Sequence, residues 1–102
     1  MTGPIDLDHF EAVTFGDRAL QDEILTLFEV QAAKLLATIS DSDGKARSEA
    51  AHALKGAARG IGAFAVADEA EKIERGTGGS ADRLASHIAE AQNAAAVLRA
   101  RA

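Results

Sequence analysis

The chain of 102 residues contains no cysteine, no tryptophan, no tyrosine and only one proline. Without cysteine it forms no disulfide, has no thiolate nucleophile and offers no cysteine ligand for zinc, so its stability must come from packing. No apolar run approaches the roughly 20 residues of a membrane span, and residues 1–6 lack the basic and apolar pattern of a secretion signal. We therefore expect a cytoplasmic protein that makes no membrane contact.

Basic residues are also scarce. The chain has 11 lysines and arginines against 16 aspartates and glutamates, which gives a formal net charge of −5. A nucleic-acid-binding domain normally presents a basic patch or stripe to the phosphate backbone, so this balance argues against a nucleic-acid partner and favours protein partners. A chain of this length buries enough surface for one core but not two, and we expect a single domain over residues 1–102.

Alanine dominates the composition, and apolar residues recur at spacings of three and four, which is the pattern of amphipathic helices. Asp6, Asp17 and Ser80 are suited to cap the starts of three of these helices. Ser40–Gly44 is a turn cluster, and Gly76–Gly79 is a loop. The sequence therefore predicts an all-α fold, an antiparallel four-helix bundle with a short extra N-terminal helix.

His52 lies on the polar face of the helix that is expected after Gly44. At about 100° per residue, one arc of this helix is polar and the opposite arc is apolar. The polar arc holds Lys45, Ser48, Glu49, His52, Lys55, Gly56 and Arg59. Lys55 at i+3 and Gly56 at i+4 are the neighbours of His52 on the helix surface. The histidine thus has a cation beside it and bare space one turn along, which is the arrangement of an accessible nucleophile.

Three glycines, Gly56, Gly60 and Gly62, fall within two turns of this helix. Each costs about 1 kcal/mol relative to alanine inside a helix, so the bare positions require an explanation. Gly60 and Gly62 are expected to break or bend the chain before the next helix. Gly56 lies on the polar arc, where no core contact calls for a small residue, and close approach by another macromolecule explains it better.

The pattern His52-x-Leu54-Lys55-Gly56, with Gly62 ten residues after the histidine, resembles the signature of histidine-containing phosphotransfer (Hpt) domains. The similarity extends over most of the chain, to Gly16-Asp17, Leu27-Phe28-Glu29 and Ile73-Glu74. The resemblance implies that phosphorylated His52 relays a phosphoryl group from aspartate to histidine to aspartate. The implied partners are receiver domains of response regulators or of a hybrid histidine kinase.

The resemblance also implies roles for other residues. Lys55 is expected to neutralise the phosphoryl oxygens, while Gly56, Arg59 and Ser48 are candidates for partner docking and clearance. Arg59 can equally be a solvated charge, and Glu74 is either a hydrogen-bonding residue beside His52 or a surface carboxylate. We expect a monomeric, stoichiometric phosphocarrier rather than an autokinase, with no bound cofactor and with Mg²⁺ held by the receiver domain.

Other motif searches fail. Gly44 at the sixth position of a calcium loop would place Ile39 first and Ala50 twelfth, which are not oxygen ligands. No Gly-x-x-x-x-Gly-Lys phosphate loop is present, so we expect no ATP site. The three histidines at positions 9, 52 and 87 are too far apart in the sequence for an i, i+4 metal pair, and we assign His9 and His87 no role.

Two other interpretations stay open. In the first, the chain is a dimerisation and phosphoacceptor fragment of a histidine kinase, although Ala53 stands where such kinases usually carry an acidic residue. In the second it is a helical adaptor that docks partners without chemistry. The set of His52, Lys55 and Gly56 favours the phosphotransfer interpretation over both.

Overall fold

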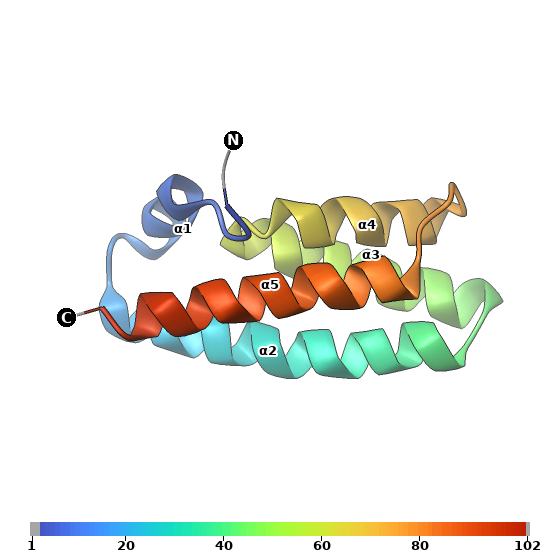
Figure 1. The fold of residues 1–102 in the computed structure, drawn as a ribbon, viewed down its shortest axis with the longest axis horizontal. Helices are drawn as coiled ribbons and strands as arrows, with labels where there is room; N and C mark the ends of the chain where they lie inside the picture. Colours follow the sequence, from blue (N-terminus) through green and yellow to red (C-terminus); the bar gives the residue numbers. More distant parts are fainter. Residues whose placement is uncertain (1–2, 102) are drawn as a thin grey trace.

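The computed structural model describes residues 3–101, which form five helices and no strand. The four long helices alternate in direction and pack as a bundle, and the short first helix lies at one end of it (Figure 1). The helices are α1 (Leu7–Thr14), α2 (Arg18–Asp41), α3 (Gly44–Ile61), α4 (Phe64–Arg75) and α5 (Ala81–Arg99). The predicted all-α bundle is confirmed. Residues 1 and 2 lie outside the described residues; they belong to the segment 1–6 that was searched for the pattern of a secretion signal.

The starts of three helices follow from capping side chains. A carboxylate oxygen of Asp6 accepts the backbone N–H three residues later at 3.2 Å, and Asp17 does the same for α2 at 3.1 Å. The hydroxyl of Ser80 accepts the corresponding N–H of α5 at 3.3 Å. Each cap satisfies a donor that the first turn of a helix leaves unpaired, which is why all three starts could be predicted from sequence.

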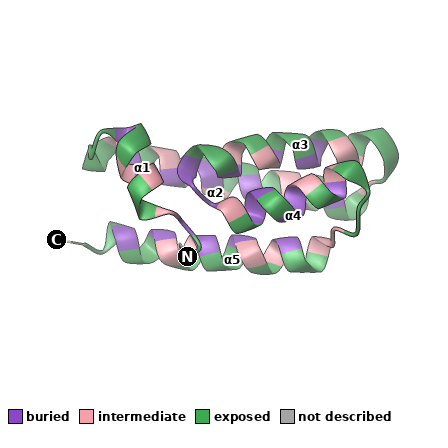
Figure 2. Ribbon diagram, turned by 90° about the horizontal axis from the view of Figure 1, so that it is seen from above, coloured by how far each residue is buried: buried purple, intermediate pink, exposed green. Residues whose placement is uncertain are grey.

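The core lies between the inward faces of α2 to α5 (Figure 2). The inward face of α3 is made mostly of alanine, and these small side chains let α2 and α4 approach it closely. Its buried residues are Ala50, Ala51, Leu54, Ala58 and Ile61. The last helix buries five residues at helical spacing, Leu84, Ile88, Ala91, Ala95 and Leu98. Within residues 3–101, no helix is long and apolar enough to cross a bilayer.

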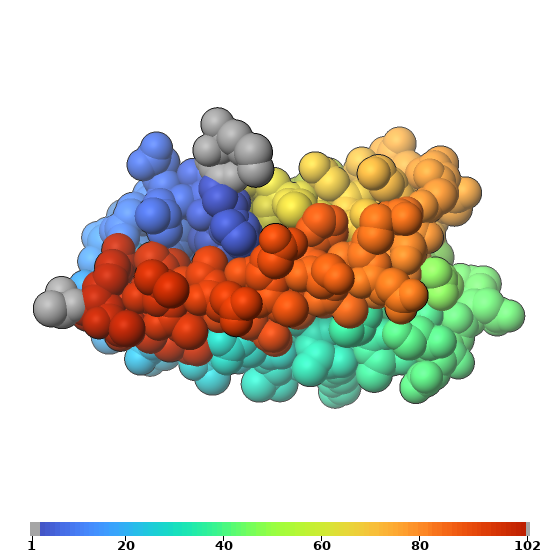
Figure 3. All heavy atoms as spheres, in the orientation of Figure 1, coloured from blue at the N-terminus to red at the C-terminus, as the bar shows by residue number. Residues whose placement is uncertain are grey.

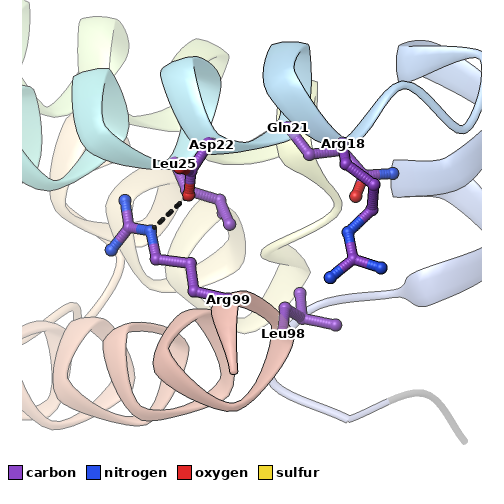
Figure 4. Close-up of a pocket in the computed structure, with 6 residues that line it drawn as sticks. All are labelled: Arg18, Gln21, Asp22, Leu25, Leu98 and Arg99. Atoms are coloured by element: carbon purple, nitrogen blue, oxygen red, sulfur yellow. Dashed lines mark hydrogen bonds and ion pairs between the residues drawn. The ribbon is translucent and has the colours of Figure 1, made fainter. Parts of the chain in front are cut away.

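Polar contacts join the end of α5 to the beginning of α2 (Figure 4). Arg99 Nε donates to Asp22 Oδ1 at 3.1 Å, and Arg99 Nη1 donates to Glu29 Oε1 at 2.7 Å. Leu25 and Leu98 line the small pocket beside this pair. Arg99 lies in the last turn of α5, near the negative end of the helix dipole, and its contacts also link two helices.

Glu69 fixes the connection between α4 and α5. Its side chain is 4% exposed, accepts the Ser80 backbone N–H at 2.9 Å and accepts Arg83 Nε at 3.3 Å. Burial raises the pKa of this carboxyl, but the Ser80 amide and Arg83 outweigh burial, and the net pKa is lower than usual. In the same connection, the backbone of Gly79 lies so close to α4 that a Cβ there would be 2.5 Å from the Ile73 nitrogen.

Two boundary predictions were wrong. The expected turn over Ser40–Gly44 is reduced to two residues, because α2 continues through Asp41 and α3 already begins at Gly44. Packing extends α2 here: Ile39 is fully buried, and its carbonyl accepts Arg47 Nη1 at 3.0 Å.

Gly60 does not break the chain either, because it lies inside α3. The helix ends at Gly62, whose φ of +81° is left-handed and whose N–H closes the last turn on Ala58 and Arg59 carbonyls. The Gly62 carbonyl also accepts the Asp6 backbone N–H at 2.9 Å. This bond fastens the N-terminal segment to the α3–α4 corner, and the space-filling view shows that segment lying against α4 and α5 (Figure 3).

Candidate functional site

The outward face of α3 presents His52 to solvent. Its side chain is 68% exposed, whereas Ala51 and Leu54 on either side point into the core and are fully buried. The alternation follows from the helical repeat, because the alanine-rich arc is buried against α2 and α4. The structure therefore holds the histidine on a rigid helix and leaves most of its ring open to an approaching molecule.

Glu74, on α4, holds the imidazole of His52. Its Oε2 lies 2.7 Å from His52 Nδ1, and its Oε1 accepts Lys55 Nζ at 2.6 Å. Since the carboxylate is an acceptor, the hydrogen-bond geometry assigns the ring proton to Nδ1 in the neutral histidine. The lone pair then belongs to Nε2. Within residues 3–101, Nε2 of His52 has no hydrogen-bond partner.

The charge of Glu74 is secured by its neighbours. The Lys55 hydrogen bond lowers the pKa of the Glu74 carboxyl most, the His52 hydrogen bond lowers it further, and partial burial opposes both. The net pKa is below its ordinary value, so the carboxylate is ionised at neutral pH. Of the two interpretations that the sequence allowed, the structure places Glu74 beside the histidine rather than alone on the surface.

Lys55 is less accessible than its position on the polar arc predicted. Its side chain is only 13% exposed, because Glu71 and Glu74 of α4 cover it. Lys55 is thus a neighbour of His52 on the polar arc, as expected, but α4 covers most of its side chain. Helical periodicity places Lys55 on the outward arc correctly, but it contains no information about a neighbouring helix that leans over that arc.

Glu71 was missed by the sequence analysis. Its Oε1 lies 3.2 Å from Arg59 Nη2, 3.7 Å from Arg75 Nη2 and 3.8 Å from Lys55 Nζ. The available signal was the pair Glu71 and Glu74 at i and i+3, followed by Arg75, which places two carboxylates on one face of a short helix. Arg59, one of the candidates for docking, is thus already paired within the chain.

Ser48 also makes a contact with α4. Its hydroxyl donates to the backbone carbonyl of Glu74 at 3.2 Å. The bond anchors the end of α4 that bears Glu74 to the helix that bears His52. Partner docking by Ser48 stays a prediction, and the observed bond gives the residue a second role in keeping the two helices in register.

Gly56 lies in open space. Beyond the adjoining residues and backbone of its own helix, a Cβ built on it would meet no atom of the described residues within 4 Å, and the same holds for Gly60 one turn later. These two glycines floor a shallow groove between α1, α2 and α3, which is walled by apolar side chains such as Val13 and Leu27. The groove begins one turn from His52, and Leu27 is 57% exposed beside it.

Comparison with known proteins decides the family. The Hpt domain family model matches residues 23–100, which is most of the chain. The chain belongs to the Hpt domain family. A solved structure, the histidine phosphotransferase ShpA from Caulobacter crescentus, is 34% identical, and the match covers 93% of this chain and 89% of that one with a TM-score of 0.79. No match is found among curated proteins.

The resemblance drawn from the His52 motif is thus confirmed, and so is the phosphorelay function that it implied. The other two histidines of the Hpt domain lie elsewhere. The ring of His9 packs edge-on against Phe64 at 5.3 Å, and His87 on α5 lies between Glu69 and Glu90. Among residues 3–101, no group of three or more histidine or carboxylate side chains is arranged to hold a metal ion.

Proposed function

We propose that this Hpt domain carries a phosphoryl group on Nε2 of His52 and exchanges it with the phosphorylatable aspartate of a receiver domain. One observation supports the choice of atom more than any other: Glu74 Oε2 lies 2.7 Å from Nδ1, while the His52 side chain as a whole is 68% exposed. Phosphoryl transfer depends mainly on positioning and charge, and a fixed, exposed imidazole supplies the positioning.

The step itself needs no net proton transfer. The Nε2 lone pair attacks phosphorus of the receiver's aspartyl phosphate in line, a P–N bond forms, and the P–O bond to the aspartate breaks to release its carboxylate. The proton on Nδ1 stays in place, so the ring gains one positive charge. Glu74 is ionised and hydrogen-bonded to that nitrogen, and it stabilises the charge as it develops. The reverse sequence returns the phosphoryl group to a second aspartate.

Lys55 acts chiefly through Glu74 in this proposal. The ammonium is bound to Glu74 Oε1 at 2.6 Å and lowers the pKa of that carboxyl, so it keeps the histidine partner charged. After transfer, the same ammonium is one turn from the phosphoryl oxygens and can attract them. Mg²⁺ bound by the receiver's own acidic residues would supply the remaining charge neutralisation during the transfer.

The groove beside His52 gives the receiver domain room to dock. Gly56 and Gly60 leave the surface of α3 bare, while Val13 and Leu27 expose apolar area along its edge. Arg59 and Ser48 flank the same helix face and are the proposed polar contacts. The proposal treats the domain as a cytoplasmic monomer that meets one receiver at a time.

The test is label transfer from a purified receiver domain charged with radiolabelled acetyl phosphate. Wild type and His87→Gln should both accept label, and His52→Gln should accept none. Label on His52→Gln would show that another residue is the acceptor. If wild type and His52→Gln bound the receiver equally and neither accepted label, the result would favour the adaptor interpretation.

A second arm uses ATP and Mg²⁺ without any receiver. The pure domain should stay unlabelled, because the sequence has no ATP-binding motif. Label on His52 under these conditions, in a preparation without contaminating kinase, would favour the kinase-fragment interpretation instead.

A further inference from the structure

Glu71 gathers three cations around one carboxylate oxygen. Arg59 and Arg75 reach it at 3.2 Å and 3.7 Å, and Lys55 reaches it at 3.8 Å while also binding Glu74. Lys55 lies one turn beyond His52 on α3, and Arg59 lies two turns beyond it. The cations on this side of the phosphorylation site are therefore already paired with a carboxylate of the same chain.

A phosphoryl group on His52 would compete for these cations. It adds about two negative charges at neutral pH, and both Lys55 and Arg59 have long side chains that can turn toward it. Glu71 opposes that movement, because its carboxylate attracts both side chains toward α4. Glu74 holds Lys55 in the same direction at 2.6 Å. The half-exposed side chains of Arg59 and Glu71 allow the exchange of partners without any change in the packing of the core.

We propose that Glu71 is a positioning residue that competes with the phosphoryl group for Lys55 and Arg59, and thereby limits the stability of the phosphohistidine. A relay protein must release its phosphoryl group as readily as it accepts it, and a histidine clamped by two free cations would release it less readily. Glu71 thus adjusts the transfer equilibrium toward onward donation. The inference rests on the proposed role of His52 as the phosphoacceptor.

The measurement is the equilibrium distribution of label between a receiver domain charged with radiolabelled acetyl phosphate and each variant of this chain. Glu71→Gln keeps the shape of the side chain and removes its charge. Asp68→Asn is the matched control, since Asp68 is an exposed residue of the same helix whose side chain forms no hydrogen bond or ion pair within residues 3–101. Glu71→Gln should shift the equilibrium toward phosphohistidine by about two- to fivefold, the range that exposed ion pairs confer, and Asp68→Asn should not.

A double-mutant cycle with Arg59→Gln separates competition from a general effect of charge. Competition predicts that Arg59→Gln removes more phosphohistidine in the Glu71→Gln background, where the arginine is free, than in wild type. Equal effects of Arg59→Gln in the two backgrounds would overturn the proposal, as would equal equilibria for Glu71→Gln and Asp68→Asn. In both cases His52 would remain the acceptor. Absence of label on wild type would overturn both proposals together.

Discussion

Two glycines of the same motif, Gly56 and Gly62, occupy opposite surroundings. A Cβ on Gly56 would meet no described atom within 4 Å outside its own stretch of helix, and the backbone there is ordinary helix. A Cβ on Gly62 would lie 3.0 Å from the Asp6 carbonyl oxygen, and its φ of +81° is unfavourable for any residue with a side chain. The fold therefore requires a glycine at position 62, whereas nothing in the fold requires one at position 56, which supports the proposal that Gly56 leaves room for a partner.

The largest effect is expected from Gly62→Ala. A left-handed backbone and crowding by Asp6 should together lower the free energy of unfolding by about 1 to 3 kcal/mol. The rate of phosphotransfer by the folded fraction should hardly change, because Gly62 is ten residues from His52 in sequence and closes the far end of the helix. Urea denaturation followed by circular dichroism measures the first quantity. A variant as stable as wild type would show that the corner relaxes easily.

Gly56→Gln should show the reverse pattern. The side chain fills the bare surface one turn from His52, so phosphotransfer from a receiver should slow by about tenfold or more, which corresponds to about 1.4 kcal/mol in the barrier. Stability should stay the same or rise slightly, because glutamine is a better helix former than glycine. Exchange at the wild-type rate would contradict the clearance argument and would place the receiver on a different face.

Gly56→Ala sharpens the comparison with the smallest possible side chain. It should stabilise the domain by up to about 1 kcal/mol, since alanine removes backbone freedom from the unfolded chain and meets no clash in the folded one. Phosphotransfer should fall only about twofold, if it is governed by the size of the side chain at this position. If Gly56→Ala instead lowered the melting temperature, the added methyl group would be crowded, and the space around Gly56 would not be open.

The smallest expected effect is on stability at acidic pH. The pKa values of Glu69 and Glu74 are both lowered from the ordinary 4.5, so the unfolded chain binds more protons than the folded one near that pH. Their contribution to stability is present above about pH 4.5 and is lost as the pH falls through the folded-state values. Denaturation midpoints measured from neutral pH into this range should fall less in a Glu69→Gln, Glu74→Gln double variant. If the denaturation midpoints of the variant and the wild type fell equally with pH, other groups would determine the loss of stability in acid.

Local signals explain what the sequence predicted well. The caps Asp6, Asp17 and Ser80 act within one turn, and the spacing of apolar residues in α5 defines its buried face, so neither depends on distant parts of the chain. Gly60 was misjudged because the cost of one glycine in a helix, about 1 kcal/mol, does not end the helix when neighbours such as Ala58 and Ile61 are buried in the core. The extension of α2 through Asp41 depends on the contact of Arg47 with Ile39, which only the folded chain brings together.

The site shows the same division. His52 and Gly56 could be placed from periodicity, since both depend only on their own helix. The cover over Lys55 and the three cations on Glu71 depend on how α4 leans against α3, and a single sequence does not encode that angle in any local pattern. Glu74 lies between these cases: the family resemblance suggested it, and its 2.7 Å contact with His52 gives it a defined partner.

The most direct test of the account is nitrogen NMR of the domain labelled at its histidine rings and phosphorylated by a receiver domain. The phosphoryl group is expected on Nε2 of His52, with the proton kept on Nδ1 of the same ring, and Glu74→Gln is expected to alter the Nδ1 resonance. A phosphoryl group on Nδ1 of His52, or on His9 or His87, would contradict it.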